Sequence, residues 1–254
     1  LAEAYVRADR RDPQAIQVVE KALQKHPEAR ELGIYLTRHY LDSGRYEDAL
    51  KLARWLLEHD KENEEIQKLV AQASFASNRL DEAIAQYQHL LSRRPDDPDA
   101  CVNLALALAN KHRTDDEAAE CYAKALAISP DLPAVRFMLA RHHAMAGRYG
   151  AALDQLAEIM RSGPEHHRRL LEEVRLYLAH APDRADLGWF LVTLLIETGQ
   201  LDEACEQLEA LLKADKDVPY VQLPADENPA LGLRGICMSL FQPDLLRETD
   251  PVLG

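Results

Sequence analysis

The chain is predicted to be an all-α repeat protein, an α-solenoid in which one helix-turn-helix unit is stacked about five to six times. The main observation is a recurring alanine near the start of a helical pattern, whose first five copies are 34, 34, 35 and 34 residues apart. The alanines are Ala15, Ala49, Ala83, Ala118, Ala152 and Ala204, and a loop residue follows each twelve positions later, namely Pro27, Lys61, Pro95, Pro130, Pro164 and Lys216. A period of roughly 20–50 residues is typical of a stacked supersecondary unit rather than of one closed core. Such solenoids commonly work by binding.

Each unit is predicted to contain two helices and a short turn. In the copy spanning residues 30–61, a first apolar stripe at helical spacing begins at Ile34, and a second begins at Ala49. Gly44 lies between them, where a positive φ would end the first helix. Acidic residues follow at Asp48, Asp81 and Asp202, where the dipole of the second helix favours negative charge.

Small residues also recur where two helices must approach closely. Ala71, Ala105 and Ala140 occupy one position of successive first helices, and the periodic alanines occupy one position of the second helices. A larger side chain at these positions would push the paired helices apart.

These features resemble the tetratricopeptide repeat (TPR) family, which has a small residue at repeat position 8, glycine at 15, alanine at 20 and proline at 32. The fourth copy matches with Ala140, Gly147, Ala152 and Pro164. The resemblance covers about residues 1–216 and implies a right-handed superhelix whose first helices line a concave, partner-binding face.

Three departures from the repeat pattern define the predicted domain organisation. Residues 1–164 carry TPR repeats, the first of which begins in mid-helix at Leu1, so we expect a fragment of a longer chain. Between Ala152 and Ala204 the step is 52 residues, and residues 165–182 fill the excess with one inserted half-repeat helix. Residues 183–216 form the last repeat. The Pro-rich residues 217–254 are expected to form a partly irregular C-terminal cap or a linker.

Composition excludes several classes of function. The chain has 254 residues, 47% hydrophobic and 29% charged, and a net charge of −13, which argues against a nucleic-acid partner. No apolar run approaches the length of a membrane span, and we expect a cytoplasmic protein. The four cysteines show no CxxC spacing and are expected to be reduced thiols, and no metal ligand set, phosphate loop, cofactor motif or catalytic constellation is present. The chain is therefore predicted not to be an enzyme and to need no cofactor or metal.

The resemblance also implies which side chains face the concave groove. The predicted contact residues are Arg38, Lys68, Gln72, Phe75, Val102, Leu106, Asn110, Phe137, Arg141, Met145 and Trp189. Apolar side chains in the middle of this groove, with the cations Lys68 and Arg141 at one side, would suit a peptide with apolar residues beside an acidic one. The alternative is that some of these residues pack between neighbouring repeats or against the C-terminal tail.

Three functional hypotheses follow. The first is a non-catalytic scaffold or adaptor that binds a protein or peptide segment in the concave groove. The second is a regulatory or substrate-recruiting arm of a larger enzyme whose catalytic domain lies outside this sequence. The third is self-association through the terminal repeats.

Overall fold

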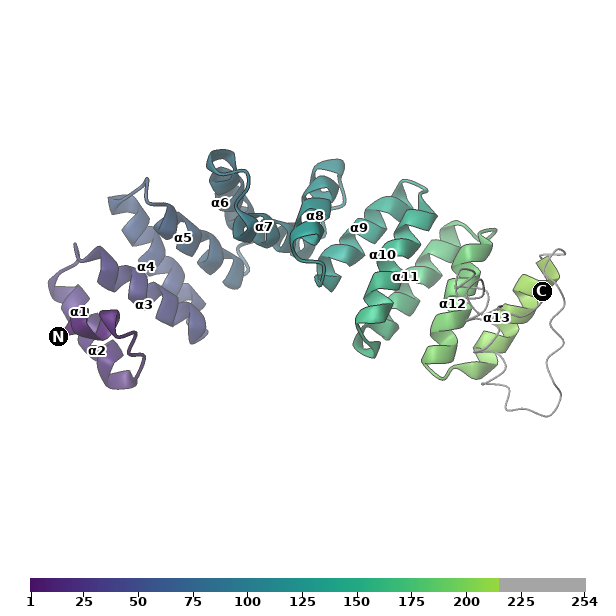
Figure 1. Cartoon of the computed structure of the whole chain (residues 1–254), viewed down its shortest axis with the longest axis horizontal. Helices are drawn as coiled ribbons and strands as arrows, with labels where there is room; N and C mark the ends of the chain where they lie inside the picture. The colour runs from purple at the N-terminus through teal and green to yellow at the C-terminus, as the bar shows by residue number, and fades with distance from the viewer. Residues whose placement is uncertain (215–254) are drawn as a thin grey trace, which may run out of the picture. The chain divides into compact units, whose positions relative to one another are not determined.

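The computed structural model describes residues 1–214 (Figure 1), and within them the chain is all-α. The helices are α1 (Ala2–Arg7), α2 (Pro13–Lys25), α3 (Arg30–Asp42), α4 (Tyr46–His59), α5 (Glu64–Ala76), α6 (Leu80–Arg93), α7 (Pro98–Asn110), α8 (Asp116–Ile128), α9 (Pro133–Met145), α10 (Tyr149–Ser162), α11 (His167–His180), α12 (Ala185–Glu197) and α13 (Leu201–Ala214). The chain divides into a first unit, residues 1–138, and a second unit that starts at Leu139, within α9. The prediction of an all-α helical-repeat fold is confirmed.

In the first unit, consecutive helices pack as antiparallel pairs. Helices α3 and α4 form one pair, α5 and α6 the next, and α7 and α8 a third, and each pair packs on the following one through α4 with α5 and α6 with α7. In the second unit, α12 pairs with α13, and α11 packs mainly on α12. Helix α11 occupies the inserted segment, preceded by a 3-10 turn at Pro164–His166.

The periodic alanines lie where paired helices touch. Each of the six from Ala15 to Ala204 is 0% exposed, and so are Ala71, Ala105 and Ala140 on the first helices. Glycine serves the same purpose at Gly33, where an added Cβ would lie 2.7 Å from the side chain of Leu56, and at Gly188, where it would lie 2.6 Å from that of Leu211. The small residues that recur along the sequence therefore mark the positions where paired helices approach closely.

The turn inside each pair has one backbone conformation whether or not it contains glycine. Gly44 has the predicted positive φ, +75°, and Gly147 and Gly199 follow at +72° and +73°. Asn78 and His112 adopt the same left-handed conformation, with φ of 58° and 56°. Asparagine and histidine are both among the non-glycine residues that adopt this region more often than others.

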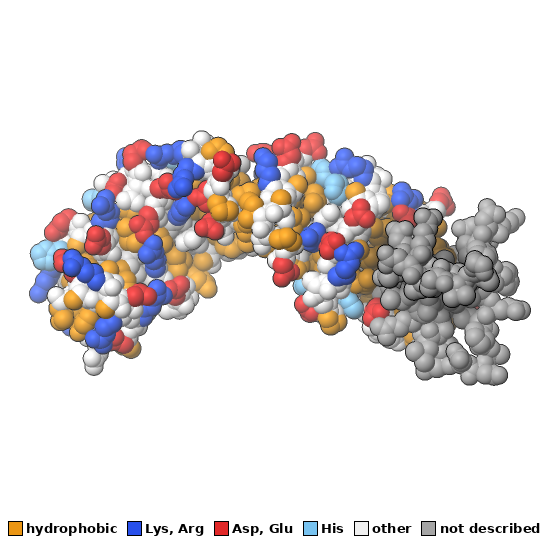
Figure 2. Space-filling view, viewed as in Figure 1, with side chains coloured by type: hydrophobic (Ala, Val, Ile, Leu, Met, Phe, Trp, Pro, Cys, Tyr) orange, Lys and Arg blue, Asp and Glu red, His pale blue; other side chains and the backbone are white. Residues whose placement is uncertain are grey.

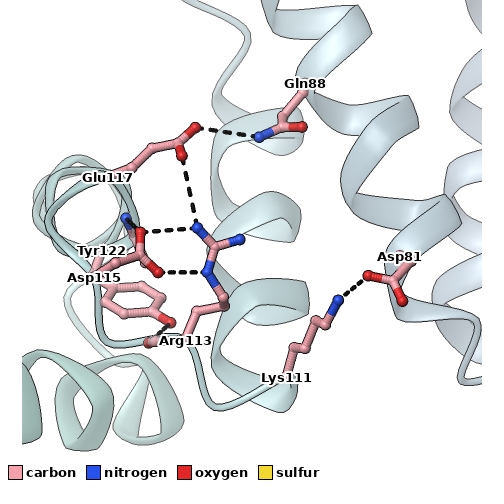
Figure 3. A network of polar contacts seen from close by, with 8 residues as sticks. Asp81, Gln88, Lys111, Arg113, Asp115, Glu117 and Tyr122 are labelled. Atoms are coloured by element: carbon pink, nitrogen blue, oxygen red, sulfur yellow. Dashed lines mark hydrogen bonds and ion pairs between the residues drawn. The ribbon is translucent and has the colours of Figure 1, made fainter.

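A polar network surrounds the His112 turn, where the third repeat has one extra residue (Figure 3). Lys111 forms an ion pair with Asp81 of α6. Arg113 contacts both carboxylate oxygens of Asp115, and the Tyr122 hydroxyl donates a hydrogen bond to the Arg113 carbonyl oxygen at 2.7 Å. Since Asp115 also caps α8 by accepting from the Ala118 amide at 3.1 Å, the network fixes both ends of the longer turn.

Two further expectations from the sequence concern membrane-spanning helices and the cysteines. Within the described part, no helix is long and apolar enough to cross a membrane. Cys101, Cys121 and Cys205 are free thiols, whereas Cys237 and the predicted C-terminal cap at 217–254 lie outside the described residues.

Candidate binding faces

In the first unit, the predicted contact residues lie on the first helices α3, α5 and α7, and they are Arg38, Lys68, Gln72, Phe75, Val102, Leu106 and Asn110. We add their helical neighbours Leu41 and Asn103, which were not predicted, and call the nine residues together the first-helix face. On α5 the residues are spaced at 68, 72 and 75 and on α7 at 103, 106 and 110, so each set shares one side of its helix. The four apolar members are half-buried, whereas Gln72 and Asn110 are exposed.

Hydrophobic side chains reach the surface in this part of the unit. In the space-filling view they gather over and around α7, while charged side chains are spread over much of the rest of the coloured face in view (Figure 2). Helix α7 is rich in alanine and leucine, and seven of its residues are buried. Half-buried Val102 and Leu106 extend this apolar interior to the first-helix face.

Three side-chain amides on the first-helix face are available to hydrogen-bond with a partner. Gln72 of α5 and both Asn103 and Asn110 of α7 make no side-chain hydrogen bond with any other residue in the range 1–214. Each amide offers two donor hydrogens and an acceptor oxygen. They can therefore bind the N–H and C=O groups of another polypeptide backbone.

The cations of the first-helix face are already paired within the unit. Arg38 of α3 binds Glu65 of α5, and the Lys68 ammonium lies 2.6 Å from Asp97, the N-cap of α7. The hydrogen bond to Asp97 raises the pKa of Lys68. Burial acts to raise the pKa of Asp97, but the hydrogen bonds from Lys68 and the Ala100 amide outweigh it and hold this pKa below its usual value. Asp97 and Glu65 are the partners that sequence reasoning missed.

In the second unit, Arg141 is likewise occupied. Its Nε lies 2.8 Å from Oε1 and 3.0 Å from Oε2 of Glu173, whose side chain is 2% exposed. The hydrogen bond to Glu173 raises the pKa of Arg141. Glu173 belongs to the inserted helix α11, so the insertion supplies a buried carboxylate that the repeat pattern alone does not predict.

The remaining predicted contact residues lie in different surroundings. Phe137 is 1% exposed, so the expectation that its ring lines an open face is corrected: the ring packs in the interior, where burying its large apolar area is most favourable. Met145 is 77% exposed. Trp189 is half-buried and packs against Val192 and Leu208.

The described residues contain no group of three or more His, Cys, Asp and Glu side chains that could hold a metal ion. Two histidines, His142 and His143, are adjacent on α9. His142 is buried with its Nε2 atom 2.8 Å from the Arg148 guanidinium, and the Nδ1 atom of His143 is buried without a hydrogen-bond partner.

Comparison with known proteins identifies the repeat. One tetratricopeptide repeat model matches residues 8–73, 116–173 and 168–223, and a second tetratricopeptide repeat model matches residues 71–133. The chain belongs to the tetratricopeptide repeat family. No curated protein sequence matches it.

Several solved TPR structures are similar to the chain. MamA AMB-1 is 20% identical with a TM-score of 0.52, covering 62% of this chain and 85% of its own. MamA MSR-1 is 19% identical with a TM-score of 0.52, covering 64% and 94%. YrrB, described as a TPR protein with an unusual peptide-binding site, is 16% identical with a TM-score of 0.47, covering 79% and 93%. At these identities the likeness to MamA shows the fold alone.

Proposed function

We propose that this TPR protein is a non-catalytic interaction scaffold whose first-helix face binds a segment of a protein partner. The observation that carries the proposal is the set of three open amides, on Gln72, Asn103 and Asn110, beside half-buried Phe75, Val102 and Leu106. TPR repeats are a protein-interaction module, and their first helices present the partner-binding face. Backbone contacts from amides together with apolar contacts are one recurring way to recognise a peptide.

The ion pairs of Arg38 and Lys68 within the chain make an acidic partner segment unfavourable. An acidic peptide residue would have to displace Glu65 from Arg38 or Asp97 from Lys68, both of which are held by short ion pairs. Leaving either carboxylate without its cation would oppose binding, most strongly for Asp97, which is 7% exposed. We therefore expect a neutral segment with one or two apolar side chains rather than the acidic peptide that the sequence suggested.

A larger enzyme that uses this chain as its regulatory or substrate-recruiting arm is the alternative. The same face would then bind the substrate protein or the enzyme's own catalytic domain. The complete open reading frame distinguishes the two, since only the alternative requires a catalytic domain on the same polypeptide. The cytoplasmic location, and self-association through the terminal repeats, stay predictions from the sequence.

The test selects a peptide from a displayed library of random 12-residue segments and measures its affinity for the purified chain. We expect the double variant Gln72→Ala, Asn103→Ala and the single variant Leu106→Asp each to lose about tenfold or more in affinity, or roughly 1.4 kcal/mol. The matched control is Gln17→Ala, which removes an exposed glutamine from the second helix α2. Equal affinity of the selected peptides for all variants, with helicity unchanged by circular dichroism, would contradict the proposal.

A further inference from the structure

Trp55 of α4 forms a wall between two pockets of the first unit. One pocket, of about 560 Å³, lies between the second helices α2 and α4, and the other, of about 980 Å³, lies at the neighbouring helix ends. Pro27 and Trp55 line both pockets, so the two are adjacent. We call the combined surface the Trp55 groove. It is built mainly from second helices and loops, and shares no lining residue with the first-helix face.

The pocket between α2 and α4 has an apolar floor and a closed polar end. Leu23, Leu36 and Leu52 line it: Leu36 belongs to the buried core cluster of the first repeats, and the partly buried Leu23 and Leu52 pack against that cluster. At its polar end, the Tyr40 hydroxyl donates a hydrogen bond to Glu20 at 2.8 Å. The Arg45 guanidinium lies over the Tyr40 ring and pairs with Asp48. Glu20, Arg45 and Asp48 are therefore paired among themselves, and the floor is left to bind apolar side chains, while the exposed Lys51 also lines this pocket.

The pocket at the helix ends is acidic. Four carboxylates line it, Glu3, Glu28, Glu31 and Asp60, against one arginine, Arg30. Arg30 is held by Asp60 at 2.6 Å, while Glu3 and Glu31 make no ion pair with any residue in the described part of the chain. The carboxylate charge at this pocket is therefore in excess.

Trp55 presents its indole next to this excess of negative charge. The ring packs against that of His59 with centroids 4.3 Å apart and the planes tilted by 37°, and His59 donates a hydrogen bond from Nδ1 to the Trp55 carbonyl oxygen at 2.8 Å. These contacts hold the indole in place. An indole face beside carboxylates is a favourable site for a Lys or Arg side chain, because the ring quadrupole and the carboxylates attract the same cation.

We propose that the Trp55 groove binds a basic amphipathic segment of a protein partner. Apolar side chains of that segment enter the pocket between α2 and α4, and a Lys or Arg side chain lies against Trp55 beside Glu3 and Glu31. Charge complementarity selects this occupant, since the pocket with free carboxylates adjoins the apolar one. Tryptophan is also among the residue types that contribute most to binding at interfaces.

The test uses two fluorescein-labelled 11-residue peptides, one of leucine and lysine and one of leucine and glutamate, and follows their anisotropy with the whole chain. We expect the Leu/Lys peptide to bind and the Leu/Glu peptide not to bind. Trp55→Leu should weaken binding about tenfold and Glu3→Gln, Glu31→Gln about fivefold, the range for cation–π and partly exposed charge contacts. The matched control, Glu120→Gln, Glu206→Gln, removes the same charge from exposed positions on α8 and α13 and should have no effect beyond twofold.

Several results would overturn the proposal. Equal weakening by the control pair would show that the net charge of −13 attracts any cationic peptide. Unchanged binding by Trp55→Leu, with normal circular dichroism, would place the peptide elsewhere. A dimer in sedimentation that Trp55→Leu dissociates would make a second copy of this chain the occupant. Gln72→Ala, Asn103→Ala should not affect the Leu/Lys peptide, so the two proposed faces succeed or fail separately.

Discussion

At the scale of single residues, side-chain size could be predicted from the sequence, whereas polar partners could not. The periodic alanines mark helix contacts because only a small side chain fits there, and repetition makes that constraint visible. The partner of Arg141, Glu173, lies 32 positions away on an inserted helix without a counterpart in other repeats. Phe137 could not be separated from its half-buried neighbours by spacing alone, because periodicity gives the face of a helix and not the depth of a side chain.

The buried pair of Arg141 and Glu173 should contribute more to stability than an exposed pair in the same unit. Glu173→Gln removes a charge that accepts hydrogen bonds in the interior, and we expect a loss of roughly 1.5–3 kcal/mol in the free energy of unfolding. Glu203→Gln breaks the exposed pair of Glu203 with Arg175 and should cost less than about 1 kcal/mol. Chemical denaturation of both variants checks this order, and equal losses would contradict it.

His143 should make the second unit sensitive to mild acid. Burial, and next the nearby Arg148 and His142, lower the pKa of His143 below its ordinary value of 6.5. The unfolded chain therefore takes up a proton at higher pH than the folded chain, and stability falls as the pH drops from about 6.5. We expect His143→Leu to show a smaller decrease in unfolding midpoint between pH 7 and pH 5 than the wild type. An identical decrease in both proteins would rule out this role.

At the scale of the elements, the sequence predicts helices well and their exact ends less well. Gly44 and Gly147 end first helices as predicted and Gly199 ends another, but Asn78 and His112 produce the same turn without glycine. Side-chain N-caps occur at α2, α5, α7 and α8 and are contributed by Asp12, Asn63, Asp97 and Asp115. Because Asp97 both caps α7 and binds Lys68, one side chain joins a helix end to the first-helix face.

Two substitutions separate these roles of Asp97. Asp97→Asn keeps a capping side chain but loses the charge that pairs with Lys68, so we expect a cost of about 1 kcal/mol. Asp97→Ala loses the cap as well and should cost about 1 kcal/mol more. Thermal unfolding of the two variants measures the difference. A smaller loss for alanine than for asparagine would show that the cap contributes nothing.

At the scale of the whole molecule, the TPR family and the all-α repeat fold could be predicted from the sequence. Every repeat needs small residues at the same helix contacts, so the pattern recurs along the chain and becomes visible. The binding partner could not be predicted, because it depends on exposed residues, which the packing of the repeats does not restrict. Two features of those residues emerge only in the structure, the internal pairing of the first-helix cations and the acidic pocket beside Trp55.

These two features predict a weak salt dependence of binding at the first-helix face and a strong one at the Trp55 groove. Binding at the first-helix face involves amides and apolar side chains, so its affinity should change less than about threefold between 0.05 and 0.5 M NaCl. Binding of the Leu/Lys peptide at the Trp55 groove should weaken clearly over the same range, because exposed charge contacts are screened. Titrations of both peptides at several salt concentrations check this. A strong salt dependence of the peptide selected for the first-helix face would contradict the neutral-segment account.

The most direct measurement of the central claim is site-specific photo-crosslinking of the selected 12-residue peptide to the whole chain. A photo-reactive residue is placed at Gln72 or Asn110 on the first-helix face, at Lys51 in the Trp55 groove, or at Gln17 on α2. The account predicts efficient crosslinks from Gln72 and Asn110 and background levels from Lys51 and Gln17. Crosslinks from Lys51 or Gln17 with none from Gln72 and Asn110 would show that the first-helix face is not the binding face.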